Sequence, residues 1–109
     1  MLIPQITVAE LKRMRDAGES VYLVDVRNPD EFAYCRLTDS LLIPLPELPG
    51  RVEEVEPPAE AQVVVLCHHG VRSLRGAAIL RSAGHDNAAS LAGGIDAWSR
   101  LVDPAVPRY

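Results

Sequence analysis

Cysteine is scarce in this sequence, which contains only Cys35 and Cys67. Two cysteines cannot build the network of disulfide bonds that stabilises many small secreted domains. The first residues also lack the charged stretch and apolar run that make up a secretory signal. We therefore expect a cytoplasmic protein, because the cytosol keeps thiols reduced.

Long hydrophobic runs and an excess of basic residues are missing as well. No run approaches the roughly 20 apolar residues of a membrane helix. The formal net charge is -4, which argues against nucleic acid or an anionic membrane surface as the main partner. The sequence has no internal repeat, no low-complexity segment and no linker that would divide it. The 109 residues, 48% of them hydrophobic, predict a single domain over 1–109 whose tail, from about residue 102, is loosely packed.

Short β-branched runs alternate with helical patterns along the chain. Strands are expected at 5–6, 21–25, 40–43, 63–66 and 88–91. Helices are expected at 7–15, 28–34, 47–55, 73–83 and from 95 onward. This alternation predicts an α/β fold, with a mostly parallel sheet and helices on both faces. Ligands of such sheets bind beyond the carboxyl ends of the strands, where Asp25, Arg27 and Cys67 are expected.

The most informative stretch is 63–73, which reads Val-Val-Val-Leu-Cys-His-His-Gly-Val-Arg-Ser. A buried strand ends at Cys67, and a helix begins near Ser73 after a short loop with one glycine. Backbone N–H groups in such a loop and at a helix start form an anion-binding concavity. Together with Arg72 and protonated histidine, this environment favours a thiolate. The stretch therefore predicts a nucleophilic sulfur in an amide-lined loop.

The candidate binding residues follow this cysteine directly: His68, His69, Gly70, Val71, Arg72 and Ser73. Of the two histidines, His69 is expected to face the ligand. Arg72 can hold a ligand, or bridge to Asp25 or Glu31, or do both. Asp25 and Arg27 are expected to form a pair that orders the site, and Glu31 is expected to cap the helix that starts after Asn28.

Four pieces of the sequence, in this order, resemble the rhodanese-like single-domain sulfurtransferases: 23–32, 43–45, 67–73 and 91–98. The resemblance implies a five-stranded parallel sheet and a cysteine that becomes a persulfide. It implies that the Cys67 thiolate takes sulfur from a small donor such as thiosulfate and passes it to a thiol or a sulfur-acceptor protein. One stretch departs from the family pattern. Residues 35–40, Cys-Arg-Leu-Thr-Asp-Ser, stand where the family has a Gly-His-Ile-Pro-Gly-Ala-like run, so no role of that histidine transfers.

Two other functions stay open at this point. Cysteine phosphatases and arsenate reductases also use a cysteine, an amide cradle and an arginine, but with a longer loop; here only four residues separate Cys67 from Arg72. The domain could also serve as a non-enzymatic interaction module, although it keeps the cysteine. Cys35 is a candidate resolving thiol for Cys67. No cofactor and no metal is expected, because adjacent Cys-His-His side chains converge poorly on one ion and no CxxC pair exists.

Overall fold

The computed structural model describes residues 2–109 and is built around a five-stranded sheet with the order β1-β5-β4-β2-β3. The strands are β1 (Gln5–Ile6), β2 (Val21–Asp25), β3 (Ser40–Leu42), β4 (Gln62–Leu66) and β5 (Ala89–Leu91). Every pairing in the sheet is parallel, which confirms the predicted α/β sheet. All five carboxyl ends therefore meet at one edge.

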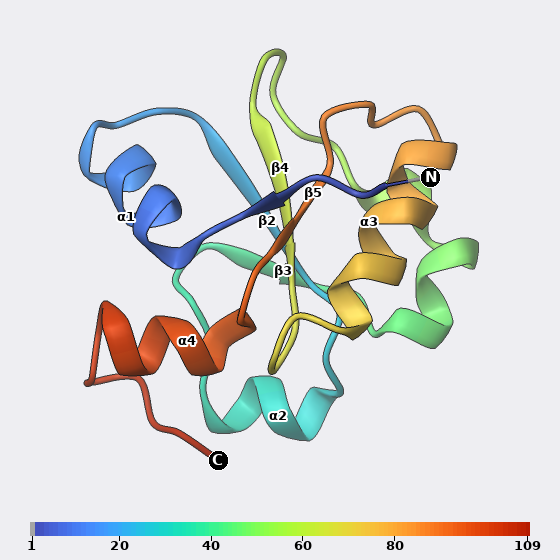
Figure 1. Cartoon of the computed structure of the whole chain (residues 1–109). Helices are drawn as coiled ribbons and strands as arrows, with labels where there is room; N and C mark the ends of the chain where they lie inside the picture. Colours follow the sequence, from blue (N-terminus) through green and yellow to red (C-terminus); the bar gives the residue numbers. More distant parts are fainter. Residues whose placement is uncertain (1) are drawn as a thin grey trace.

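Helices cover both faces of this sheet (Figure 1). One face carries α1 (Val8–Asp16) and α4 (Gly94–Leu101). The other carries α3 (Arg72–Ser82) and two short 3₁₀ helices, η1 (Leu45–Gly50) and η2 (Val52–Glu54). The remaining helix, α2 (Pro29–Tyr34), lies beyond the carboxyl edge. None of the helices within residues 2–109 has the length and apolarity needed to cross a bilayer.

The central strand β4 is buried on both faces, as parallel sheets require. Val64 and Leu66 join the hydrophobic cluster beneath α1 and α4, whereas Val63 and Val65 join the cluster beneath α3. Because side chains alternate along a strand, the next residue, Cys67, falls on the α3 side. The pattern of β4 thus decides on which face of the sheet the thiol lies.

The helix predicted over 47–55 is wrong in type. The structure forms η1 and η2 there instead, with Glu47 N donating to Pro44 O over 2.8 Å in a three-residue step. Pro46 and Pro49 lie within η1 and have no N–H to donate, so a regular α-helical ladder cannot be completed. Short 3₁₀ turns need fewer consecutive donors and replace it.

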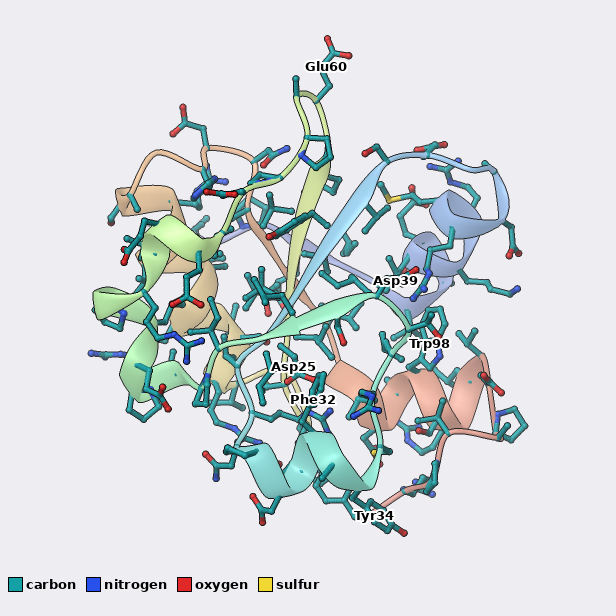
Figure 2. All side chains as sticks on the ribbon, turned by 180° about the vertical axis from the view of Figure 1, so that it is seen from behind. Asp25, Phe32, Tyr34, Asp39, Glu60 and Trp98 are labelled. Carbon is teal, nitrogen blue, oxygen red and sulfur yellow. The ribbon has the colours of Figure 1, made fainter. Side chains whose placement is uncertain are left out.

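The departure from the family pattern at 35–40 has a local consequence at Asp39. This residue, labelled in Figure 2 at the turn before β3, has a φ of 64°. Such left-handed backbone favours glycine, and Asp is one of the few other residues that adopt it readily. The chain thus forms a left-handed turn before β3 without a glycine.

Candidate active site

Cys67 lies at the carboxyl edge of the sheet, directly after β4, and is 1% exposed. Its Sγ accepts N–H bonds from Gly70 over 3.1 Å and from Ser73 over 3.3 Å. The loop therefore turns back on its own first residue. Of the amides expected to surround the sulfur, these two make hydrogen bonds to it, and the second belongs to the first turn of α3. Partial positive charge at this helix start faces the sulfur.

Backbone conformation explains why glycine is needed in this loop. Gly70 has a φ of +99°, and a Cβ there would lie 3.0 Å from the backbone N of Gly93. Gly94, with a φ of +60°, opens α4, and a Cβ on it would collide with the carbonyl oxygens of Cys67 and His68. The loop and the start of α4 therefore pack backbone to backbone, which larger residues would prevent.

The start of α4 fixes the outer side of the loop. Ile95 N donates to Cys67 O over 2.9 Å, and Asp96 N donates to His68 O over 3.0 Å. These helix N–H groups would otherwise lack partners. The carbonyls of Cys67 and His68 are thus held by α4, while the N–H groups of Gly70 and Ser73 face the sulfur. The 91–98 motif thus supports the site through its backbone.

A pair of buried serines completes the surroundings of the sulfur. Cys67 Sγ lies 3.4 Å from Ser73 Oγ, which in turn lies 2.7 Å from Ser90 Oγ, and both hydroxyls are fully buried. When the thiol is protonated it donates to Ser73; when it is ionised, the Ser73 hydroxyl can donate to the sulfur. Ser73 was predicted as a site residue, whereas Ser90 was not. Its only signal in the sequence is one polar residue within a short strand.

Asp25 and Arg27 form a fully buried ion pair at the end of β2. Arg27 Nε lies 3.0 Å from both Asp25 carboxylate oxygens, and Nη2 lies 2.7 Å from Oδ2. Nη2 also donates to Cys35 O over 2.7 Å. The structure thus shows the expected pair, which ties β2 to the chain after α2. Figure 2 shows Asp25 between the sheet edge and α2.

Cys35 takes part in this surrounding rather than in the loop. It is 6% exposed, and Arg27 Nη1 approaches its Sγ at 3.8 Å. Both Cys35 and Cys67 are free thiols in the structure. Nothing in these contacts links the two sulfurs, so a resolving role for Cys35 stays a prediction.

Arg72 pairs with Glu31, one of the two carboxylates predicted for it. Nη1 and Nη2 of Arg72 lie 2.7 and 2.9 Å from the Glu31 oxygens. Glu31 also accepts the Asn28 backbone N–H over 2.9 Å, as expected for a capping residue of α2. The Arg72 guanidinium holds the pKa of Glu31 at about 2, with help from the Asn28 amide and against the cost of burial. Glu31 is therefore ionised and joins α2 to the start of α3.

The two histidines of the loop lie ring against ring, with centroids 3.8 Å apart. His69 is exposed, whereas His68 is half-buried and its Nε2 is buried without a hydrogen-bond partner. Burial lowers the pKa of His68, and the neighbouring His69 lowers it further. Val71 is 75% exposed at the N-cap of α3. His69 and Val71 thus form the solvent-facing part of the loop.

One group of potential metal ligands comes together among residues 2–109. Ligand atoms of His68, His69 and Asp96 lie within 4.8 Å of one another. Both Asp96 oxygens, however, already accept bonds from guanidinium groups, with Arg100 Nε at 2.9 Å and Arg108 Nε at 3.1 Å. A cation would have to displace two arginines, so this donor set fits a metal poorly.

The last residue is a part of the site that the sequence did not predict. Residues from about 102 were expected to be loosely packed, but Tyr109 stacks on His68 with centroids 3.9 Å apart. Its hydroxyl donates to Glu31 Oε2 over 2.8 Å and accepts from Arg27 Nη1 over 2.9 Å. Figure 2 shows the end of the chain beside Tyr34, whose ring meets that of Tyr109 edge-on. Side-chain contacts of Tyr109, rather than regular structure, thus join the end of this largely exposed tail to the site.

The fold and the site together define a class of protein. A parallel α/β domain carries a buried cysteine in an amide-lined loop at the carboxyl edge of its central strand. The family model described as rhodanese-like domain matches residues 7–101. The chain therefore belongs to the rhodanese-like domain family.

Individual relatives carry sulfurtransferase names. A protein named "Sulfurtransferase" from Allochromatium vinosum is 38% identical over 105 residues, and the match covers 96% of each chain. "Adenylyltransferase and sulfurtransferase MOCS3-1" from Zea mays is 36% identical over 110 residues, covering 96% of this chain but 24% of that protein. This chain thus spans about a quarter of the length of such relatives.

Solved structures agree with this family. A rhodanese-related protein from Thermoplasma volcanium has a TM-score of 0.81 at 27% identity, over 97% of this chain and 99% of that one. The human single-domain sulfurtransferase TSTD1 has a TM-score of 0.76 at 27% identity, over 90% and 96%. The family to which the chain belongs thus includes proteins that are named as sulfurtransferases.

Proposed function

We propose that this chain carries sulfane sulfur as a persulfide on Cys67, which it receives from a small donor such as thiosulfate. The observation that supports this most directly is the pair of N–H bonds from Gly70 and Ser73 to Sγ. Hydrogen bonds from amides to an ionised sulfur are favourable in a site with little water. The same donors suit the anionic outer sulfur of a persulfide.

In the first half-reaction, the Cys67 thiolate attacks the outer sulfur of thiosulfate. A bond forms between the two sulfur atoms, and the original S–S bond of thiosulfate breaks. The electron pair of that bond leaves with sulfite, a stable anion that needs no proton in order to depart. No general base is required, because the loop environment supports the thiolate directly. The Ser73 hydroxyl turns to donate to the sulfur, with Ser90 as its second partner.

In the second half-reaction, a nucleophile attacks the outer sulfur of the persulfide. The bond to Cys67 Sγ breaks, and its electron pair restores the thiolate. Cyanide serves as the laboratory acceptor, and a thiol or an acceptor protein in the reducing cytosol is the cellular one. His69 and Val71 face solvent at the loop and are placed to meet donor and acceptor.

The remaining site residues act by holding the loop. Arg72 is bound by Glu31, so in this proposal it orients the start of α3 and adds positive potential near the sulfur. Asp25 and Arg27 order the sheet edge beneath α2. His68 and Gly70 shape the turn. A tetrahedral oxyanion, the substrate of the phosphatase alternative, would need a wider loop than four intervening residues provide.

The test is the intact mass of the protein after exposure to thiosulfate. We expect a gain of one sulfur atom that is lost on adding a thiol, and formation of thiocyanate when cyanide is added. Cys67→Ser should abolish both, whereas Cys35→Ala, the matched control at the only other cysteine, should keep both. Sulfur uptake that survives in Cys67→Ser, or turnover of an aryl phosphate by the unmodified protein, would overturn the proposal.

A further inference from the structure

Tyr109 is linked to both ends of the loop that holds Cys67, directly at the first end and through Glu31 at the second. At the start of the loop its ring stacks on His68, with planes 6° apart. At the end of the loop it acts through Glu31: the Tyr109 hydroxyl donates to Oε2 over 2.8 Å, and the same carboxylate binds Arg72. The backbone N–H groups that point at the sulfur lie between these two contacts or directly beside them.

The hydroxyl of Tyr109 is anchored on the sheet. It accepts from Nη1 of Arg27, which is fully buried and held in turn by Asp25 and by Cys35 O. Partial burial raises the pKa of Tyr109 to about 12, so the hydroxyl keeps its proton and donates to Glu31 at any physiological pH. One hydrogen-bonded series thus runs from the end of β2, through the last residue, to the carboxylate that holds α3.

The tail that brings Tyr109 to this place has a second tie to the loop. Arg108 Nε lies 3.1 Å from Asp96 Oδ1, and the Asp96 N–H donates to His68 O. The Arg108 side chain is 60% exposed, so this ion pair adds little stability by itself. Val106 packs against the hydrophobic cluster beneath α1 and α4. The contacts of Tyr109 are therefore the main ones that relate the tail to the loop.

We propose that Tyr109 is a positioning residue for sulfur transfer: by holding His68 directly and Arg72 through Glu31, it keeps the loop in the geometry in which its amides face Cys67. This inference rests on the proposed function only for its kinetic consequence. Its structural content, the order of the loop, can be measured without any sulfur chemistry.

Three variants separate the two contacts. Tyr109→Phe keeps the ring on His68 and removes only the hydroxyl. Tyr109→Ala removes both contacts. Tyr22→Phe is the matched control, because the Tyr22 hydroxyl also accepts a hydrogen bond, from Glu56 N at 3.1 Å, outside the site.

The first readout is amide hydrogen exchange at Gly70 and Ser73, followed by NMR in the absence of donor. We expect exchange about tenfold faster in Tyr109→Ala, a smaller increase in Tyr109→Phe, and unchanged rates in Tyr22→Phe. Exchange elsewhere in the sheet serves as the internal reference for global stability. Equal acceleration at both loop amides and the core of β4 would reduce Tyr109 to a general stabilising contact and overturn the proposal, as would unchanged loop exchange.

The second readout is the kinetics of thiocyanate formation. We expect kcat to fall about tenfold in Tyr109→Ala while KM for thiosulfate changes less than about twofold, with partial rescue by phenylalanine. Wild-type kcat in Tyr109→Ala would also overturn the proposal. If the unmodified protein takes up no sulfur while its loop amides still depend on Tyr109, the proposed function fails and the positioning of the loop by Tyr109 stands.

Discussion

The ring of Tyr109 lies almost parallel to the imidazole of His68, with 3.9 Å between their centroids and 6° between their planes. Burial lowers the pKa of His68 and the neighbouring His69 lowers it further, whereas the carboxylate of Asp96, a hydrogen bond to the Tyr109 backbone and the carboxylate of Glu31 act in the opposite direction. The neutral imidazole is therefore the form that the folded protein favours. Its Nε2 is buried without a hydrogen-bond partner.

This relationship predicts a pH dependence of stability. Because the folded pKa of His68 lies below the ordinary value of 6.5, its contribution to stability is present above pH 6.5 and is lost as the pH falls through the folded pKa. Urea unfolding across this range should show a steeper loss for the wild type than for His68→Asn. NMR titration should place the midpoint of His68 below 6.5 and move it upward in Tyr109→Ala. A midpoint at or above 6.5 in the wild type would contradict the burial argument.

Glu31 predicts a second pH dependence, at lower pH. Its pKa is about 2 in the folded protein, against the ordinary glutamate value of 4.5, so its contribution to stability is present above pH 4.5 and is lost as the pH falls toward 2. Glu31→Gln should lower the free energy of unfolding by about 1 to 2 kcal/mol at pH 7 and by much less near pH 2. Urea titrations at both pH values measure this, with the exposed Glu53→Gln as control. A loss for Glu31→Gln that does not shrink at low pH would show that packing rather than charge is responsible.

Two glycines with positive φ test the contact between the loop and α4. Gly18 (φ +71°) has no atom within 4 Å of the position of a Cβ, whereas a Cβ on Gly94 (φ +60°) would strike the loop carbonyls. Gly18→Ala should cost about 1 kcal/mol, the price of the backbone conformation alone. Gly94→Ala should cost about 3 kcal/mol or more and should reduce sulfur uptake in the fraction that still folds. Thermal unfolding compares the two, and equal losses would show that the loop yields without strain.

For the two buried serines we expect similar losses of unfolding free energy on substitution but different losses of kcat. Ser73→Ala and Ser90→Ala each remove a buried hydrogen bond and should each cost about 1 to 2 kcal/mol in unfolding free energy. Only the Ser73 hydroxyl also lies beside Cys67 Sγ, at 3.4 Å. Ser73→Ala should therefore lower kcat for thiocyanate formation about tenfold, and Ser90→Ala no more than about threefold. Equal kinetic losses would contradict this prediction and would show that the Ser73 hydroxyl works only when Ser90 orients it.

Asp39 offers a prediction about the departure from the family pattern. Its φ of 64° is tolerated by Asp, more costly for Ala and free of strain for Gly. Asp39→Ala should therefore be less stable than Asp39→Gly by about 1 kcal/mol, with the wild type between them. Thermal unfolding measures the order of the three, and alanine as the most stable would mean that the turn relaxes.

The sequence predicts most of this fold because its signals are local. The continuous apolar run of β4 and the cap residues Thr7 and Asn28 mark elements whose observed limits lie within a residue or two of the expected ones. The polar helix predicted over 47–55, broken or delayed by Pro49-Gly50, is replaced by η1 and η2 because Pro46 and Pro49 lack the amide donors that an α-helix needs. Topology alone then brings Asp25, Arg27 and Cys67 to one edge, as predicted.

The site residues that the sequence does not predict are brought to the site by tertiary packing. Ser90 lies 17 residues from Ser73, and Tyr109 lies 82 residues from Arg27, with no motif that links either pair. The choice of Glu31 rather than Asp25 as the partner of Arg72 depends on where α2 settles beneath the sheet edge. The sequence places Tyr109 in a loosely packed tail because residues 102–109 carry two prolines.

The pairing of the first strand with the last determines when, during folding, the surroundings of Cys67 are complete. Gln5 pairs with Ser90 and Ile6 with Leu91, so the sheet closes only after residues 89–91 are available. The N–H groups of Ile95 and Asp96, which hold the carbonyls of Cys67 and His68, also come from the segment that follows β5. In the sulfur-transfer proposal, Cys67 therefore has its complete amide-lined surroundings only after this late segment has docked, and loading of the native site has to follow that step.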